Sequence, residues 1–215
     1  MTFSNPDIPS SSMPELWWIA QRILAAVLLV LSAPLWLGFA ILIRVGSPGA
    51  LIVRQPREGR GGAIFAVFKL RTMHCDADAR LASSLSDPAV AEEWRRFGRL
   101  VDDPRIAGRF GALARRYSID ELPQLANVVR GEMALVGPRP LPPEIAARLR
   151  TEDLEARRAV VPGLTGLWQV SGRSALDLEA MGQIDHDYVR RRCVLLDLSI
   201  LLRTLFVVVS ARGAY

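Results

Sequence analysis

The sequence predicts a helix-dominated α/β domain that is attached to a membrane by its N-terminal part. Residues 23–43, ILAAVLLVLSAPLWLGFAILI, carry no charge and are numerous enough to cross the ~30 Å hydrocarbon core of a bilayer. The chain that follows, over residues 47–190, alternates between short strand-like and helix-like segments. Neither an internal repeat nor a long linker interrupts residues 47–215, so we expect one compact domain there.

The composition restricts the partners and the metals that this chain could bind. The net charge is +5 and the pI about 10.0, which favours a phosphorylated substrate, an anionic lipid or a nucleic acid. Cys75 and Cys193 fit neither a disulfide framework nor a zinc knuckle, and they indicate a reducing compartment. His74 and His186 are too few for a histidine-rich metal site. Any metal is therefore expected to be a hard cation held by carboxylates.

Two features of the apolar segment bear on how it meets the membrane. Trp17 and Trp18 precede it, and tryptophan favours the membrane interface. Pro34 lies near its centre and removes a backbone hydrogen bond, while the hydroxyl of Ser32 can satisfy a freed carbonyl. Such a break could kink a spanning helix, or it could turn the chain back so that both ends face the cytoplasm.

The charges that flank this segment favour a cytoplasmic location for the C-terminal part. Residues 1–15 are rich in Ser and Pro, contain no basic side chain and are expected to be disordered. By the positive-inside rule, charge alone favours a single span over the re-entrant alternative. The arginines that follow the segment are Arg44, Arg54, Arg57 and Arg60.

A second apolar stretch covers residues 193–209, where Asp197 and Arg203 interrupt it. Three arginines precede it at positions 190–192. This pattern fits an amphipathic interfacial helix that lies against anionic headgroups. A buried core helix fits the pattern equally well.

The local signals between these stretches predict a hairpin and several helices. Residues 49–55 and 63–73 look like two strands, separated by the turn-rich residues 56–62. Residues 160–174, VVPGLTGLWQVSGRS, are too rich in Gly and Pro for regular structure. Helices are expected over residues 76–100 with an interruption at SSLSDP, from near Ser118, and over residues 141–158.

The adjacent carboxylates Asp120 and Glu121 allow two interpretations. Ser118 and Glu121 have the spacing of a capping box, and both carboxylates complement the positive end of a helix dipole. This structural interpretation needs no chemistry. However, a helix N-terminus also suits anionic substrate oxygens, so a catalytic role is compatible with it.

Basic residues stand where phosphate chemistry would need them. Lys69 and Arg71 are two apart, so on a strand they would share one face. Each of these side chains taken alone is more often a solvated surface charge, although arginine suits bidentate phosphate recognition. No Walker A sequence and no nucleic-acid module is recognisable, so no nucleic-acid partner is expected. Further candidates are Arg115 and Arg116 before the carboxylates, Arg139 between two prolines, and Arg173 in a glycine-containing loop.

Four motifs together resemble the bacterial sugar transferases, a family of monotopic phosphoglycosyl transferases. SPGALIVRQPREGRGGAIF, KLRTM, DPRIAGRFGALARRYSIDELPQLANVVRGEMALVGPRP and PGLTGLWQVSGR occur in the family's order and spacing. The resemblance runs from about Leu24 to the C-terminus. The ending SARGAY and the short length look most similar to the undecaprenyl-phosphate galactose phosphotransferases of exopolysaccharide synthesis.

The resemblance implies a ping-pong transfer of a hexose 1-phosphate from a UDP-sugar, galactose or glucose, to undecaprenyl phosphate. Asp120 would be the nucleophile, and Glu121 together with Asp120 would hold Mg²⁺. An acyl phosphate is reactive enough to pass its group on, and Mg²⁺ offsets the repulsion between two anions. Lys69, Arg115, Arg139, Arg173 and Asp197 match the family's active-site surround, and Arg71 or Arg116 could replace their neighbours.

The resemblance also implies a place in the cell. Residues 16–46 would form a re-entrant helix broken at Pro34, with Ser32 one residue farther from the proline than is usual. Residues 47–215 would form the catalytic domain on the cytoplasmic face of the bacterial inner membrane. A homo-oligomer is left open, and so is the donor sugar. The competing interpretation is an inactive scaffold, attached to the membrane, that docks other glycan enzymes.

Overall fold

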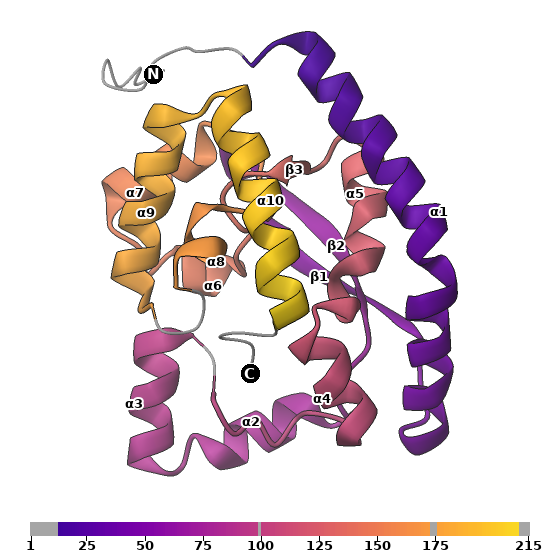
Figure 1. The fold of residues 1–215 in the computed structure, drawn as a ribbon. Helices are drawn as coiled ribbons and strands as arrows, with labels where there is room; N and C mark the ends of the chain where they lie inside the picture. Colours follow the sequence, from indigo (N-terminus) through magenta and orange to yellow (C-terminus); the bar gives the residue numbers. More distant parts are fainter. Residues whose placement is uncertain (1–12, 99, 173–175, 211–215) are drawn as a thin grey trace.

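The structure is a computed structural model that describes residues 13–98, 100–172 and 176–210 (Figure 1). Its helices are α1 (Glu15–Gly46), α2 (Ala77–Ser84), α3 (Pro88–Phe97), α4 (Gly108–Arg116), α5 (Leu125–Val129), α6 (Pro143–Ala146), α7 (Thr151–Arg158), α8 (Leu167–Ser171), α9 (Leu178–Arg191) and α10 (Val194–Ser210). Two 3₁₀ turns are η1 (Arg60–Gly62) and η2 (Ile119–Gln124), and the strands are β1 (Ile52–Glu58), β2 (Ile64–Leu70), β3 (Ala134–Val136) and β4 (Gly163–Thr165). The helix-dominated α/β prediction is confirmed.

The predicted hairpin is confirmed, but its turn is shorter than expected. Strands β1 and β2 pair antiparallel from Ile52 opposite Leu70 to Glu58 opposite Ile64. Pro56 was assigned to the turn, yet it lies inside β1. A proline is tolerated there because the two-stranded sheet leaves the outer edge of β1 without a partner strand, where no N–H is needed.

Regular structure in residues 160–174 corrects the expectation of an irregular segment. Strand β4 pairs parallel with β3, and α8 follows it. The glycines here permit close packing rather than a turn: a Cβ on Gly163 would lie 2.0 Å from the backbone nitrogen of Gly137. A strand that packs this closely against another backbone needs glycine. Because glycine is also typical of loops, the sequence of this strand resembles that of a loop.

The other predicted helices are confirmed with breaks. Residues 76–100 hold α2 and α3, and Asp87 caps α3 by accepting the backbone N–H of Ala89 at 2.8 Å. Residues 141–158 hold α6 and α7 as separate elements.

Helix α1 runs along one whole side of the molecule as a single 32-residue helix (Figure 1). Pro34 lies inside it without ending it, so the expected break is not seen as an interruption of the helix. The Ser32 hydroxyl donates to the carbonyl of Leu29 at 3.3 Å, one turn back. Among the described residues, α1 alone is long and apolar enough to cross a membrane, and only 11% of its most apolar stretch is buried.

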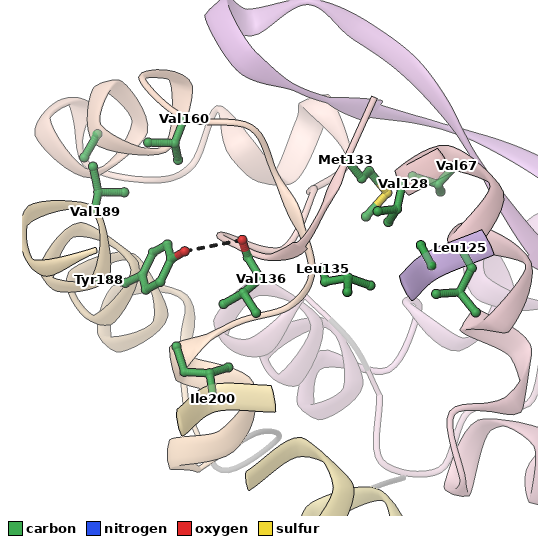
Figure 2. Packing of buried hydrophobic residues seen from close by; sticks show 12 residues of the cluster. Val67, Leu125, Val128, Met133, Leu135, Val136, Val160, Tyr188, Val189 and Ile200 are labelled. Atoms are coloured by element: carbon green, nitrogen blue, oxygen red, sulfur yellow. Dashed lines mark hydrogen bonds between the residues drawn. The ribbon is translucent and has the colours of Figure 1, made fainter. Parts of the chain in front are cut away.

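Both halves of α1 nevertheless pack on the rest of the chain. In its first half, Ala25 joins the main apolar core, which α5, β3, α9 and α10 also supply (Figure 2). In its second half, Ala40 and Ile43 join a second apolar cluster with Leu70 of β2 and Ala114 of α4. The helix is therefore part of the domain along its length.

Candidate active site

The Asp120–Glu121 pair lies in the 3₁₀ turn η2, between α4 and α5. Ser118 adopts the left-handed conformation, with φ 55°, and its side chain makes no capping hydrogen bond. The predicted capping box is therefore wrong, because a capping serine needs an extended backbone. Ile119 and Leu122 point into apolar clusters on either side of the pair.

Glu121 is held by two cations from different parts of the chain. Lys69 of β2 donates to Oε1 at 3.0 Å, and Arg139 donates to Oε2 at 2.9 Å and also to Oε1. Burial alone would raise the pKa of Glu121, but the charges of Arg139 and Lys69 and their hydrogen bonds hold it well below its usual range. Glu121 is thus a fixed carboxylate whose oxygens are both in use.

Asp120 is in a different state from its neighbour. Its side chain is only 10% exposed, and its nearest cation among the described residues is Lys69, whose Nζ lies 3.8 Å from Oδ2. That distance is too long for a hydrogen bond. Burial raises the pKa of Asp120 and the charge of Glu121 adds to this, while the nearby cations only partly oppose it. The pair therefore contains one clamped carboxylate and one that is buried, basic and available.

A fully buried amide fixes Lys69 opposite this pair. The Oδ1 of Asn127 on α5 accepts the backbone N–H of Phe68 at 3.0 Å, and its Nδ2 donates to the carbonyl of Ala66 at 2.8 Å. One side chain thus binds β2 as a neighbouring strand would. This contact ties the segment that carries the carboxylates to the strand that carries Lys69. Asn127 could not be identified from the sequence, because a helix-interior asparagine gives no signal of its own.

Arg57 of β1 is a second residue that sequence reasoning did not place in the site. Its guanidinium donates to the carbonyl of Pro56 at 3.0 Å and to Oε1 of Gln55 at 2.8 Å. Burial and then the charge of Arg139 lower the pKa of Arg57 to about 10, against the opposing charges of Glu144 and Glu121. Within the described chain Arg57 has no carboxylate partner within ion-pair distance, although the charges of Glu144 and Glu121 act on it.

The structure separates the predicted basic residues into two groups. Lys69 and Arg139 contact the carboxylate pair directly, and Arg115 lies close enough to favour the charged form of Asp120. Arg116 is exposed, with its guanidinium 6.0 Å from the centre of the Tyr117 ring. Arg173 lies outside the described residues.

Arg71 and Asp197 have other partners. Strand β2 ends at Leu70, and the Arg71 guanidinium donates to the carbonyls of Ser47 and Pro48, which follow α1. The expectation that Lys69 and Arg71 act together on one face is therefore not met. Asp197 of α10 is buried, and its oxygens accept from Trp17 and Tyr188 rather than from the site's arginines.

The donor set at the pair suits a cation that arrives with its substrate. The described residues hold no cluster of three or more His, Cys, Asp or Glu side chains that could bind a resident metal. Mg²⁺ commonly uses one or two carboxylates together with substrate phosphates and water. Asp120 has oxygens free for such a cation, whereas Glu121 can contribute only by giving up part of its ion pairs.

The model of the family described as bacterial sugar transferase matches residues 16–211. The chain belongs to the bacterial sugar transferase family. The matched region includes the pair of carboxylates and all of α1 after its first residue, so the site and the apolar helix are parts of one family unit.

The transferase has relatives of different lengths. It is 38% identical over 194 residues to the exopolysaccharide production protein ExoY of Sinorhizobium fredii, over 90% of this chain and 85% of that protein. It is 42% identical over 204 residues to UDP-glucose:undecaprenyl-phosphate glucose-1-phosphate transferase of Caulobacter vibrioides, over 92% and 71%. It is 38% identical over 192 residues to undecaprenyl-phosphate galactose phosphotransferase of Salmonella typhimurium, but over 88% and only 39%.

Proposed function

We propose that this chain transfers a hexose 1-phosphate from UDP-galactose or UDP-glucose to undecaprenyl phosphate and releases UMP. The observation that carries the proposal is the contrast within the pair, where Glu121 is clamped by Lys69 and Arg139 while the buried Asp120 keeps its oxygens available. Relatives named for transfer from UDP-sugars and to undecaprenyl phosphate support the substrate classes. The reaction would be a first membrane step in the synthesis of an exopolysaccharide or a related glycan.

In the first half-reaction, a carboxylate oxygen of Asp120 attacks the β-phosphorus of the UDP-sugar. The bond from that phosphorus to the bridging oxygen breaks, and UMP leaves with the electron pair. The sugar phosphate is then an acyl phosphate on Asp120. Burial and the negative charge of Glu121 favour this step, because they make the carboxylate of Asp120 more basic than a solvated one.

In the second half-reaction, a phosphate oxygen of undecaprenyl phosphate attacks the same phosphorus. The bond to Asp120 breaks, the carboxylate is regenerated, and undecaprenyl diphosphate sugar is released. Lys69 and Arg139 neutralise charge on the phosphates in both steps from fixed positions. Mg²⁺, held by Asp120 and in part by Glu121, would supply further neutralisation of the pyrophosphate when it is bound.

We propose that the chain attaches to one face of a membrane, the cytoplasmic face of the inner membrane, and the packing of α1 supports the one-sided attachment. Gln21 accepts the backbone N–H of Leu135 at 2.9 Å near one end of α1, and Ile43 packs in the cluster of Leu70 near the other. A helix of this length, about 48 Å, could span a bilayer only by carrying the domain packed against both halves into the hydrocarbon. We therefore propose that both ends of α1 stay on the same side of the bilayer.

Helix α10 would add a second apolar contact with the lipid. Its inner face buries Asp197 and Ile200, while its outer face is exposed, which favours the interfacial interpretation over a buried core helix. The site would then lie beside the membrane, where a lipid acceptor and a soluble nucleotide sugar can meet. The exposed apolar residues of α10 are Leu195, Leu198, Leu202, Leu205, Phe206 and Val209.

The test is UMP release by the detergent-solubilised full chain with Mg²⁺. UDP-galactose, UDP-glucose and UDP-N-acetylhexosamines are compared, each with and without undecaprenyl phosphate. We expect turnover with UDP-galactose or UDP-glucose and, without acceptor, a burst of at most one UMP per enzyme together with a hexose phosphate adduct on Asp120. Asp120→Asn should abolish both while the protein remains folded.

Two results would contradict the proposal. A ternary mechanism would give no burst in the absence of acceptor, even though turnover occurs in its presence. An inactive scaffold would release no UMP from any donor, and Asp120→Asn would then be indistinguishable from wild type in every assay.

A further inference from the structure

The segment that carries Arg139 is held by backbone carbonyls on both sides of that residue. Gly163 donates its N–H to the carbonyl of Pro138 at 2.9 Å, and Glu58 donates its N–H to the carbonyl of Leu141 at 2.9 Å. Both donors are backbone groups of β4 and β1. The carbonyl of Arg139 itself is bound differently, by the side chain of Arg157 from α7.

Arg157 makes one contact to Arg139 and one to a buried acid. Its Nη2 donates to the carbonyl of Arg139, and its Nη1 donates to Oδ2 of Asp185 on α9. Arg157 is 9% exposed, and Asp185 is completely buried. The guanidinium thus bridges a buried carboxylate and the backbone of the residue that clamps Glu121.

The contacts around the Arg157 bridge do not indicate that it serves mainly to stabilise the fold. A second buried carboxylate, Asp153 of α7, lies nearby and contacts Nδ1 of His186 at 3.2 Å. Among the described residues, Oδ1 of Asp185 and Oδ2 of Asp153 have no hydrogen-bond partner. A buried ion pair with unpaired oxygens usually stabilises a protein no better than apolar side chains of the same size. An arginine in this place is therefore better explained by what it holds.

We propose that Arg157 is a positioning residue for phosphate transfer: it fixes the backbone at Arg139, so that the Arg139 guanidinium stays on Glu121 and faces the substrate phosphates. The chain of contacts runs from Asp185 through Arg157 to the carbonyl of Arg139, and from the side chain of Arg139 to Glu121. Arg157 touches neither the carboxylate pair nor the substrate. The proposal rests on the proposed function of the pair.

The test compares Arg157→Met, Arg157→Lys and Arg139→Met in the detergent-solubilised full chain, alone and in the combination of both methionine changes. We expect Arg157→Met to lower kcat/KM for the UDP-sugar by about 10- to 100-fold, in the range of a lost positioning contact. In the Arg139→Met background the same change should lower kcat/KM by less than 3-fold, because the Arg139 guanidinium that Arg157 positions is no longer present. Arg157→Lys keeps a charged donor and should recover part of the activity.

Two controls separate positioning from folding. Arg150→Met removes an exposed arginine next to α7 that pairs with Glu152, and it should stay within 3-fold of wild type. Arg157→Met should still fold, since burial raises the pKa of Asp185 to about 7 and that acid can remain neutral without its partner. If Arg157→Met does not fold, Arg157→Lys carries the test in the same two backgrounds.

The proposal is overturned if folded Arg157→Met has the kcat/KM of wild type. It is also overturned if the losses of kcat/KM in Arg157→Met and Arg139→Met multiply in full in the double variant. A second measurement does not depend on turnover. Inorganic pyrophosphate with Mg²⁺ should raise the melting temperature of wild type and Arg150→Met but not of Arg139→Met or Arg157→Met. If wild type is stabilised by pyrophosphate but releases no UMP, the proposed function fails and the positioning proposal is still decided by these shifts. If pyrophosphate stabilises Arg157→Met as it does wild type, the positioning proposal fails.

Discussion

The indole N–H of Trp17 donates to Oδ2 of Asp197 at 2.9 Å, which joins two residues that are 180 positions apart in the chain. The other oxygen of Asp197 accepts the hydroxyl of Tyr188 at 2.8 Å. Three helices therefore meet at one buried carboxylate: α1, which would contact the lipid, and α9 and α10. The family resemblance predicts Asp197 in the active-site surround; in the structure its two oxygens form a joint between the first and last described helices.

The joint predicts that Asp197 matters for stability more than for chemistry. Asp197→Ala leaves the half-buried indole N–H of Trp17 without its partner and leaves the Tyr188 hydroxyl only the carbonyl of Val136, at 3.3 Å, so each lost hydrogen bond should cost about 1 kcal/mol. We expect a lower melting temperature in detergent, while kcat/KM of the folded fraction stays within about 3-fold of wild type. Trp17→Phe removes one of the two bonds and should lower the melting temperature less.

A result that reverses this pattern would restore the family-based expectation. If Asp197→Ala melts like wild type but loses UMP release by 100-fold or more, Asp197 acts on the substrate and not as a joint.

The raised pKa of Asp120 predicts the pH dependence of the reaction. Attack requires the carboxylate, so kcat/KM should fall as the pH drops through the pKa of Asp120, which lies above the ordinary value of about 3.9. Arg115 favours the carboxylate, so Arg115→Met should raise that pKa further. The acid limb of the pH–rate profile should then move to higher pH.

Arg116→Met is the matched control, because Arg116 is exposed and stacks on Tyr117. Its acid limb should coincide with that of wild type. Equal shifts in both variants would mean that net charge, and not the position of Arg115, sets the pKa of Asp120. This comparison also decides between the two adjacent arginines that the sequence could not distinguish.

The features of the fold and of the site differ in how far each could be predicted from a short stretch of sequence. The hairpin and most helices follow from patterns within a few residues, so they could be predicted, whereas the local pattern at Asp120 and Glu121 predicted only a capping box, and their catalytic interpretation came from the family resemblance. The contacts of Lys69 and Arg139 with Glu121 could be anticipated only from the family resemblance, since the three residues come from separate segments. Gly163 misled the prediction because a glycine that allows close strand packing has the same local signature as one in a loop.

Arg57 shows what the sequence could not reveal and leads to a prediction for substrate binding. It was used only as a positive charge flanking the apolar segment. The structure places it half-buried near Arg139, and because no carboxylate of the described residues lies within ion-pair distance of it, its guanidinium can bind a substrate phosphate. Arg57→Met should therefore raise KM for the UDP-sugar by about 10-fold, or 1.4 kcal/mol, with a smaller effect on kcat.

Arg54→Met is the control on the same strand, because Arg54 is exposed and lies 5.5 Å from the centre of the Phe68 ring. Its KM should be unchanged. If Arg54→Met and Arg57→Met raise KM equally, the effect comes from the overall positive field of the protein, and Arg57 has no specific place in the site.

The topology of α1 can be tested at its two ends. A re-entrant helix leaves both ends on the cytoplasmic face, whereas a spanning helix puts the start of α1 on the opposite side. Single cysteines would be placed at the exposed positions Pro14 and Gly46, at the ends of α1, after Cys75 and Cys193 are replaced by serine. A membrane-impermeant maleimide should label both positions in inverted membrane vesicles and neither in intact spheroplasts. Labelling of position 14 only in spheroplasts would show that α1 spans. That outcome would also require part of α1 to separate from the domain. Gln21 and Ala25 near one end of α1 and Ile43 near the other end all contact the same domain, which cannot lie on both sides of the bilayer.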